Sequence, residues 1–477
     1  MNNKTKMLAG IIAVMSVMTS AVSCSADKNH KTGSLSIEPT SADTSIKITD
    51  GEQEITVTEE PEVVTEPATL GDPVDIHGTE IVWLSDYDLN PAPNAERPVA
   101  VALFEDVFGG KIKYVQTSAR NKFTTLSSMI LAGEEVDMFE YEQKEFPKGV
   151  VSNQYQPLDT YFRSMGMNTG IWNDMQDVID SLEFRNSHYV IPYSLADPVV
   201  MIYSRKLIKD NKLQDPYQLY KKDEWDWDSF LELSEKYREK TGKHSIRGNL
   251  GSSLIHSAGQ TIIGYKNGNL ISNINSPQIR MAELFMQDIA SESLYSSYWN
   301  DYYTADTLFF VCDSWMLGNS NVKNPDMDLM VVPVPKSPDA DGNYIMCDIN
   351  AKMLVRNSTK GDAVATYIQC ERIAATQEEY VKGAKEYALI PRTYSNGTVK
   401  SYITEEQYDA LQSFTDTSQV TPVFDYAYGM GDRLSGSGGV TESISNTFLI
   451  NGGTEEDWKN LRNMCSDIIR QVIEEYK

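Results

Sequence analysis

Residues 80–139, EIVWLSDYDLNPAPNAERPVAVALFEDVFGGKIKYVQTSARNKFTTLSSMILAGEEVDMF, decide the fold class of this chain. Three short segments are apolar or alternate between polar and apolar side chains, which predicts strands at 80–84, 111–116 and 136–139. Between the first two strands, residues 98–108 repeat apolar side chains at helical spacing, from a proline suited to a first turn up to a pair of glycines. Residues 122–132 form the second predicted helix. Strand, helix, strand, helix, strand predicts a parallel sheet covered by helices.

The rest of the chain continues in the same α/β manner. Further strands are expected at residues 188–193, 198–203, 308–312, 329–333 and 349–355. Asp226 is placed to cap a helix that begins with a core residue, Trp227. The last helix has a capping box, Thr454 with Asp457, and a continuous apolar stripe. In parallel sheets ligands sit at the carboxyl ends of strands, so the loops after Leu84 and Phe139 are expected to line a site.

The N-terminal segment has the features of an export signal. Basic residues are followed by an apolar run over residues 7–14, and small residues then lead to Ala21-Val-Ser-Cys24. A cysteine directly after three small or apolar residues resembles the lipobox of bacterial lipoproteins, although Ala21 stands where leucine is preferred. We therefore expect residues 1–23 to be a lipoprotein signal peptide and Cys24 to be lipidated. A plain signal peptide with an incidental cysteine is the alternative.

The segment that begins at Cys24 differs sharply in composition from the rest of the chain. Residues 24–77 are rich in Ser, Thr, Glu and Pro, and no aromatic side chain is present to seed a core. Low hydrophobicity and like charges predict a disordered acidic tether between the lipid and a folded body. No later run reaches the roughly 18 apolar residues that a membrane-spanning helix needs.

Composition limits the partners of the folded body. The chain of 477 residues has 41% hydrophobic and 10% aromatic residues, enough for a large core in two or three domains. Its net charge of −26 argues against nucleic acid as a partner. Cysteine and histidine are scattered without metal-ligand spacing, so no cofactor or metal is expected. Buried free thiols are the simplest interpretation of Cys312, Cys347, Cys370 and Cys465, although disulfides stay possible outside the cell.

Several motifs, in their order, resemble a known family. They are Leu158-Asp-Thr-Tyr-Phe, Tyr189-Val-Ile-Pro followed by Met201-Ile-Tyr-Ser-Arg-Lys-Leu, Trp227-Asp-Ser-Phe, and Val332-Pro-Val-Pro-Lys. Together with the lipobox they resemble extracellular, family 1 type solute-binding lipoproteins of carbohydrate ABC transporters, over about residues 78–477. The resemblance implies a type II periplasmic-binding-protein fold, with two α/β lobes joined at a hinge and solute held between them. Lobe 1 is expected to comprise 78–195 plus 350–400, and lobe 2 to comprise 196–349 plus 401–477.

The resemblance also implies which residues face the solute. The eight candidates follow strands, lie at the hinge crossings or lie in cleft loops: Trp83, Glu140, Tyr141, Tyr193, Asp197, Trp315, Asp348 and Arg392. A sugar ring packs its C–H face on an aromatic side chain, while its hydroxyls need carboxylate acceptors and arginine donors. Trp315 is the preferred platform. Trp83 is equally compatible with a core position, and the carboxylates could instead be solvated charges or backbone caps.

Three other function classes remain open from the residues alone. Paired carboxylates such as Glu140 and Glu142 could serve a glycan-acting enzyme, which needs two such groups roughly 5 to 9.5 Å apart. A long tether would also suit a surface adhesin, and the acidic candidates could hold a polyamine or another cationic solute. We expect instead a non-catalytic monomer, lipid-anchored on the extracellular face of the cell membrane, that delivers a sugar or oligosaccharide to ABC permease subunits.

Overall fold

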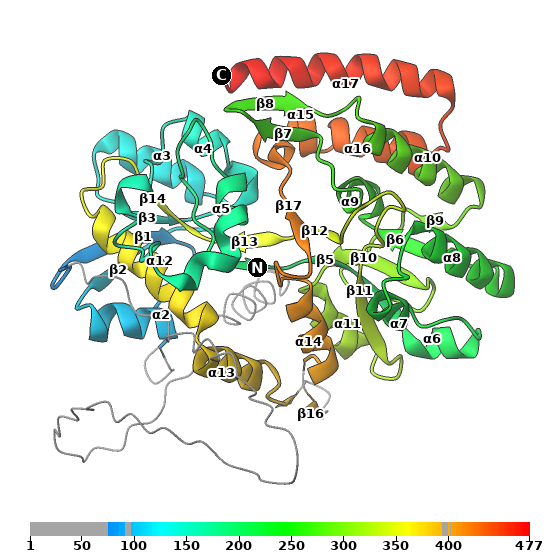
Figure 1. The fold of residues 1–477 in the computed structure, drawn as a ribbon, viewed down its shortest axis with the longest axis horizontal. Coiled ribbons are helices and arrows are strands. Elements are labelled where there is room, and N and C mark those ends of the chain that lie inside the picture. Colours follow the sequence, from blue (N-terminus) through cyan, green and yellow to red (C-terminus); the bar gives the residue numbers. More distant parts are fainter. Residues whose placement is uncertain (1–74, 91–96, 394–398, 401) are drawn as a thin grey trace, which may run out of the picture.

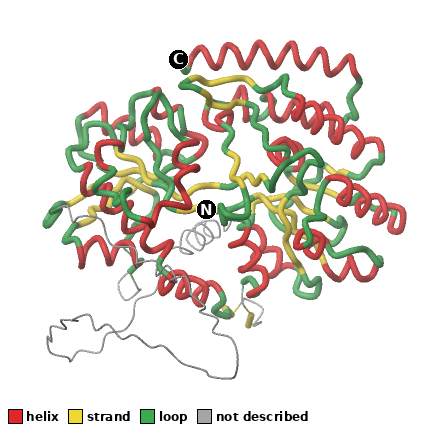
Figure 2. Tube along the Cα trace, in the orientation of Figure 1, coloured by secondary structure: helices red, strands yellow, loops and turns green. Residues whose placement is uncertain are grey.

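The computed structural model describes residues 75–90, 97–393, 399–400 and 402–477, with the backbone alone at 392–393 and 399–400. The predicted signal peptide, Cys24 and almost all of the tether lie outside these residues. Two α/β lobes stand side by side, each with a sheet in its interior and helices around it (Figures 1 and 2). No helix in the described part of the chain combines the length and the apolar character needed to cross a membrane.

The first lobe is built on the stretch that decided the fold class. Its sheet has the order β14-β3-β1-β2, with strands β1 (Glu80–Ser85), β2 (Lys111–Gln116), β3 (Met138–Glu140) and β14 (Lys352–Leu354). β1 pairs in parallel with both β2 and β3, as predicted, and β14 adds an antiparallel edge. Five of the six side chains of β1 are buried, as expected for a strand that lies between two others inside the lobe.

Helices and short turns complete the first lobe. They are α2 (Val99–Ala102) with its π-helical continuation η2 (Leu103–Val107), α3 (Lys122–Ala132), η3 (Gln143–Glu145), α4 (Lys148–Val151), η4 (Asp159–Tyr161), η5 (Gly170–Met175), α5 (Gln176–Ser181), α12 (Gly361–Thr376) and α13 (Glu378–Ala388). The two helices predicted from periodicity lie at α2–η2 and α3. The helix α3 ends at Gly133, whose φ of 71° is the left-handed conformation that glycine adopts freely.

The second lobe has a mixed five-stranded sheet of order β11-β5-β10-β6-β9. Its strands are β5 (Val199–Ser204), β6 (Ile246–Gly248), β9 (Tyr295–Ser296), β10 (Phe309–Asp313) and β11 (Leu329–Pro333). The surrounding helices are α6 (Arg205–Asp210), α7 (Pro216–Lys221), α8 (Trp227–Thr241), α9 (Leu250–Ser257), α10 (Pro277–Ser291), α11 (Met316–Lys323) and α14 (Glu405–Ser413). Asp226 caps α8 as predicted, since its carboxylate accepts a hydrogen bond from the backbone N–H of Ser229 at 2.9 Å.

Short strands connect the lobes and extend them. β4 (Ser194–Ala196) and β13 (Asp348–Asn350) form an antiparallel pair between the two sheets, and β12 (Tyr344–Met346) pairs in parallel with β17 (Thr421–Val423). The remaining short strands are the hairpin β7 (Ile263–Lys266) with β8 (Asn269–Ser272), and β15 (Arg392–Thr393) with β16 (Val399–Lys400). The C-terminal segment contains η6 (Tyr426–Gly429), α15 (Asp432–Ser435), α16 (Val440–Ser445), η7 (Asn446–Ile450) and α17 (Glu455–Glu475), which runs along one edge of the molecule (Figure 1).

Two strand predictions near the crossing were wrong. Residues 188–193 are irregular and the strand begins only at Ser194, because these backbone groups bond outside any ladder: the carbonyl of His188 accepts from Leu158 N–H at 2.8 Å. The apolar run 349–355 is divided between β13 and β14, which belong to different sheets. At the division, the carbonyl of Ala351 accepts from the N–H of Tyr141 at 3.2 Å. The apolar run therefore indicated buried strands at the crossing, but not the position at which one strand ends and the next begins.

The four cysteines in the described residues agree with the simplest interpretation. Cys312, Cys347, Cys370 and Cys465 are all free and buried. Burial raises the pKa of the Cys347 thiol, and that of Cys465 to about 11, so both remain neutral thiols at physiological pH. They fill the core as small apolar groups.

Candidate functional site

A cavity of about 1060 Å³ lies between the lobes. Its wall combines the segment after β3, both crossing strands, the turn after β10, and the facing helices α12, α13 and α14. A saccharide of a few rings fits a space of this size, which is at the upper end of small-molecule sites. Besides charged groups, the wall carries neutral side chains able to donate and accept hydrogen bonds, namely Gln143, Ser194, Ser314, Asn350, Thr376, Gln412, Ser413, Thr415 and Gln419.

The crossing strands set the position of two carboxylates. In the antiparallel pair, Asp348 lies opposite Ala196, and the chain then turns at Asp197 into β5. The Asp197 backbone has a φ of 42°, a left-handed conformation that aspartate tolerates better than most residues. The side-chain amide of Asn350 donates to the Ser194 hydroxyl at 2.9 Å, which adds a side-chain hydrogen bond between the two strands. The hinge itself therefore presents Asp197 and Asp348 to the cavity.

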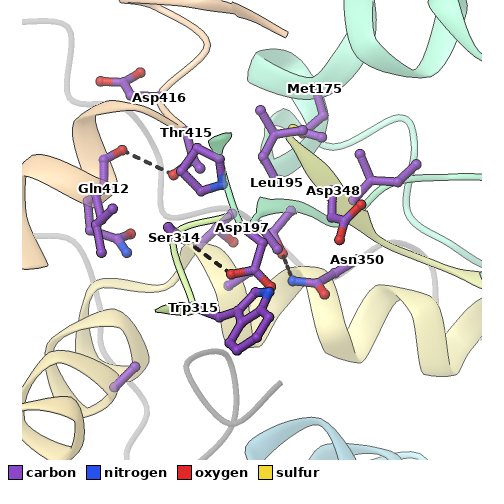
Figure 3. Close-up of a pocket in the computed structure, with 18 of the residues that line it drawn as sticks. Met175, Leu195, Asp197, Ser314, Trp315, Asp348, Asn350, Gln412, Thr415 and Asp416 are labelled. Carbon is purple, nitrogen blue, oxygen red and sulfur yellow. Dashed lines mark hydrogen bonds between the residues drawn. The ribbon is translucent and has the colours of Figure 1, made fainter. Parts of the chain in front are cut away.

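The turn between β10 and α11 brings an aromatic platform to the same place. Trp315 is half-buried there and lies beside Asp197 on the cavity wall, with Asp348 across from them (Figure 3). Two bonds fix the turn on the crossing: the N–H of Ser314 donates to the carbonyl of Pro198 at 3.1 Å, and its hydroxyl donates to the Asp197 carboxylate at 3.2 Å. The Trp315 side chain bonds to Asp313. The indole is thus held rigidly, with part of its surface free.

The aspartates around this platform affect one another. Burial, followed by the charges of Asp348 and Asp313, raises the pKa of Asp197 to about 7, although hydrogen bonds from the Ser314 hydroxyl and the backbone N–H of Trp315 lower it in part. Burial, followed by the charges of Asp313 and Glu142, raises the pKa of Asp348 to about 6. The carboxylates of Asp197 and Asp348 on the cavity wall therefore lie close to that of Asp313 behind them, and none of the ion pairs found in the described residues includes Asp197, Asp313 or Asp348.

The glutamates at the end of β3 and in the segment after it are paired with lysines. Glu140 accepts a hydrogen bond from the Tyr87 hydroxyl at 2.7 Å and lies 3.5 Å from the ammonium of Lys122 and 3.8 Å from that of Lys352. Glu142 pairs with Lys122 and, at 2.7 Å, with Lys144. Because Lys122 and Lys352 are both buried, this network is held firmly and orients Glu140 and Glu142 at the cavity wall.

The family model for bacterial extracellular solute-binding proteins matches residues 91–368, more than half of the chain. The chain belongs to this family. The family consists of binding proteins rather than enzymes, and its description gives an extracellular location. A comparison with curated protein sequences found no match to this solute-binding protein.

Solved structures share the fold of this solute-binding protein at low sequence identity. The cyclic α-maltosyl-1,6-maltose binding protein of Arthrobacter globiformis has a TM-score of 0.59 at 14% identity, covering 83% of this chain and 99% of the other. The ABC substrate-binding protein of Listeria monocytogenes solved with cycloalternan has 0.53 at 15%, covering 82% and 99%. The transporter-associated binding protein of B. animalis subsp. lactis solved with β-1,6-galactobiose has 0.52 at 16%, covering 83% and 98%. These likenesses confirm the predicted type II fold with two α/β lobes.

Five of the eight predicted site residues line the cavity of this solute-binding protein: Glu140, Tyr141, Asp197, Trp315 and Asp348. Two others do not. Trp83 is fully buried in the first lobe, where its indole N–H donates to the carbonyl of Tyr87 at 3.1 Å. Tyr193 is 3% exposed, and its ring and that of Trp83 both face the Lys352 ammonium, at 5.9 and 5.1 Å. The expectation that Trp83 and Tyr193 face the cleft is therefore corrected, because both are buried and pack around Lys352, whose ammonium lies near Glu140.

Two further sequence assignments stay predictions. The backbone of Arg392 begins β15, but its side chain lies outside the described residues, as does Cys24. Sequence reasoning also missed part of the wall. The missed residues lie on helix faces and on a turn far from the predicted loops: Asp174, Met175, Arg372, Thr376, Val381, Ala384, Tyr408, Leu411 and Gln412. The pattern of an amphipathic helix indicates that one face is buried but not what it packs against, so no local signal identified these positions.

The raised pKa of Asp197 predicts how the stability of this solute-binding protein depends on pH. Because the folded-state pKa of about 7 exceeds the ordinary value of 3.8, the folded state binds more protons than the unfolded state between about pH 4 and 7. Stability contributed by this group therefore falls as pH rises through that window. We expect Asp197→Asn to raise the melting temperature of the solute-free protein at pH 8, by about 1 °C for each kcal/mol of stabilisation, and to change it little at pH 4.

Thermal unfolding of both proteins at pH 4, 6 and 8 checks this expectation. Asp288→Asn, at an exposed position of α10, makes the same change of charge away from the cavity and should shift the melting temperature equally at all three values. An Asp197→Asn effect that does not grow with pH would contradict the assignment of the proton to this carboxyl group.

Proposed function

We propose that this solute-binding protein captures a sugar or oligosaccharide in the cavity between its lobes and delivers it, unaltered, to the permease subunits of an ABC importer. The observation that carries the proposal is the half-buried indole of Trp315 on the cavity wall, between carboxylates and neutral hydrogen-bonding groups. A pyranose presents apolar C–H faces to such a ring and a rim of hydroxyls to the polar groups around it. The solved complexes of similar fold, with cycloalternan and β-1,6-galactobiose, support a saccharide ligand.

The division of the chain into moving parts belongs to the same proposal. We place residues 78–195 plus 350–400 in one lobe and 196–349 plus 401–477 in the other. The pair β4–β13 lies between the two main sheets and carries two wall residues, so a rotation at this pair changes the shape of the cavity. The facing helices α13 and α14 are linked by Lys385, which pairs with Glu405 at 2.9 Å and Asp409 at 2.7 Å. Closure is expected to bring α13, α14 and the pair β4–β13 together around the solute.

The N-terminal part of the proposal rests on sequence. Cys24 at the end of a lipobox-like segment would carry the lipid, and the acidic tether would hold the monomeric binding body outside the cell near its permease. Two acyl chains hold a protein stably on a bilayer, whereas one does not. Metabolic labelling with a fatty acid, comparing the full chain with its Cys24→Ala variant, tests the anchor separately from the solute.

A ligand screen followed by chromatography of the ligand tests the function. Thermal shifts are recorded with neutral oligosaccharides, amino sugars, spermidine and short peptides, and each stabilising compound is then recovered and checked for cleavage. The proposal expects stabilisation by a saccharide and recovery of the saccharide intact. Cleaved saccharide would show an enzyme, while stabilisation by spermidine or peptide alone would show a different solute class.

A further inference from the structure

The charges on the cavity wall are strongly one-sided. The wall carries seven carboxylates, Glu140, Glu142, Asp174, Asp197, Asp348, Asp409 and Asp416, and two basic side chains, Lys144 and Arg372. Both basic groups are already paired, Lys144 with Glu142 and Arg372 with Asp174. No basic side chain on the described wall is therefore free to receive an acidic group of a solute, which makes a uronic acid or a sugar phosphate a poor fit.

Most of the carboxylates are also satisfied. Lys122 pairs with both glutamates, and Lys352 and Lys144 supply a second cation to Glu140 and Glu142, respectively. Arg372 pairs with Asp174, and Lys385 pairs with Asp409. Asp416 accepts hydrogen bonds from the hydroxyl of Ser418 and the amide of Gln419. Asp197, Asp348 and Asp416 are the wall carboxylates for which the described residues supply no cation, and among these three it is the charge of Asp348 that acts on Asp197. Neighbouring Asp313 lacks a cation as well and adds to their repulsion.

Asp197 lies beside the Trp315 ring, and Asp348 lies across from both (Figure 3). A hydroxyl group can bond to a carboxylate, but it leaves the charge of two adjacent carboxylates uncompensated. An ammonium group supplies three donors together with a positive charge, and it is also attracted to the face of an indole. The carboxylates and the ring therefore form a receptor for a cationic group inside a cavity whose remaining wall is suited to sugar hydroxyls.

We propose that the solute is a basic saccharide, whose free amino group binds as an ammonium between Asp197 and Asp348 against the Trp315 indole. This inference rests on the proposed function and specifies the class of sugar. The crossing strand β13 carries Asp348, and Asp197 directly follows β4, so the ammonium would link the two sides of the hinge pair. The amino group would thereby contribute to holding the lobes around the solute.

A matched pair of ligands tests the inference. Glucosamine oligomers of two to four units and their fully N-acetylated counterparts differ at each unit only in whether the nitrogen is a free amine or a neutral amide. Calorimetric titration at pH 7.5 is expected to give at least tenfold tighter binding of the amino form. Asp348→Asn should reduce that preference to threefold or less, whereas Asp288→Asn, which changes the charge equally outside the cavity, should preserve it.

Each outcome is decisive. Equal or tighter binding of the acetylated form, or binding of neutral saccharides alone, overturns the inference and leaves the saccharide-binding function standing. Binding of spermidine with no saccharide bound overturns both the inference and the proposed function. A preference for the amino form that Asp348→Asn leaves unchanged overturns the placement of the ammonium group at the hinge pair.

Discussion

Replacing Trp315 with alanine is expected to weaken saccharide binding about 100-fold, or by about 2.8 kcal/mol, while the protein remains folded. The indole offers a half-buried face at the cavity wall, so its removal takes away both apolar contact and the surface that orients the sugar ring. The turn keeps its backbone bond from Ser314 to Pro198, which explains why folding should survive. Titration calorimetry gives the affinity, and thermal unfolding verifies the fold.

A second tryptophan provides a matched control. Trp299 is 46% exposed, packs its edge on Phe310 at 5.7 Å between ring centroids, and is not among the residues lining the cavity. Trp299→Ala removes the same side chain and should leave the affinity unchanged. Trp315→Phe keeps a smaller aromatic face and should fall between the wild type and Trp315→Ala. Equal losses in Trp299→Ala and Trp315→Ala would show that the cavity is not the site.

Replacing Arg372 with alanine is expected to destabilise the first lobe by about 3 kcal/mol. This guanidinium is 3% exposed and donates to the carbonyls of Ile171 at 2.6 Å and Tyr193 at 2.9 Å, while it also pairs with Asp174. Without it, two carbonyls in buried surroundings lose their donors. Tyr193 directly precedes the crossing strand β4, so the loss should also loosen the hinge and weaken binding.

Thermal and denaturant unfolding measure this loss. Arg356→Ala is the matched control, because Arg356 is exposed and its side-chain hydrogen bond to the carbonyl of Asn153 is 3.5 Å long. That variant should stay within about 0.5 kcal/mol of the wild type. Arg372→Lys keeps the charge but lacks the fork that reaches two carbonyls, so it should recover only part of the stability. Equal stability of the two alanine variants would contradict the structural role of Arg372.

The main features of the fold could be predicted because, in residues 80–139, the spacing of apolar side chains and the positions of glycines indicate the same helices and strands. An apolar run predicted β1, alternation of polar and apolar side chains predicted β2, helical spacing predicted α2–η2, and a pair of glycines marked the end of that helical segment. The strands around the crossing were harder. There the chain passes from one sheet to another, and each segment is buried whichever sheet it joins. The apolar run that contains β13 and β14 gives no sign of where one strand ends and the next begins. That boundary is set by the strands with which each pairs, β4 and β3, which are distant in sequence.

The candidate site was predictable where it follows strand ends and turns. Asp197 directly follows β4 and Trp315 lies in the short turn after β10, and such positions face the space between the lobes. Trp83 occupies an apparently similar position near the end of β1, but that strand lies between two others inside the lobe. The helical part of the wall, including Gln412 on α14, is brought to the cavity only by the tertiary arrangement.

A crystal structure with the saccharide that stabilises the protein most tests the central claim directly. We predict a sugar ring stacked on the Trp315 indole at van der Waals distance, about 4 Å, with contacts to Asp197 and Asp348 and to groups of both lobes. A saccharide bound elsewhere on the surface, with the Trp315 face left free, would contradict it.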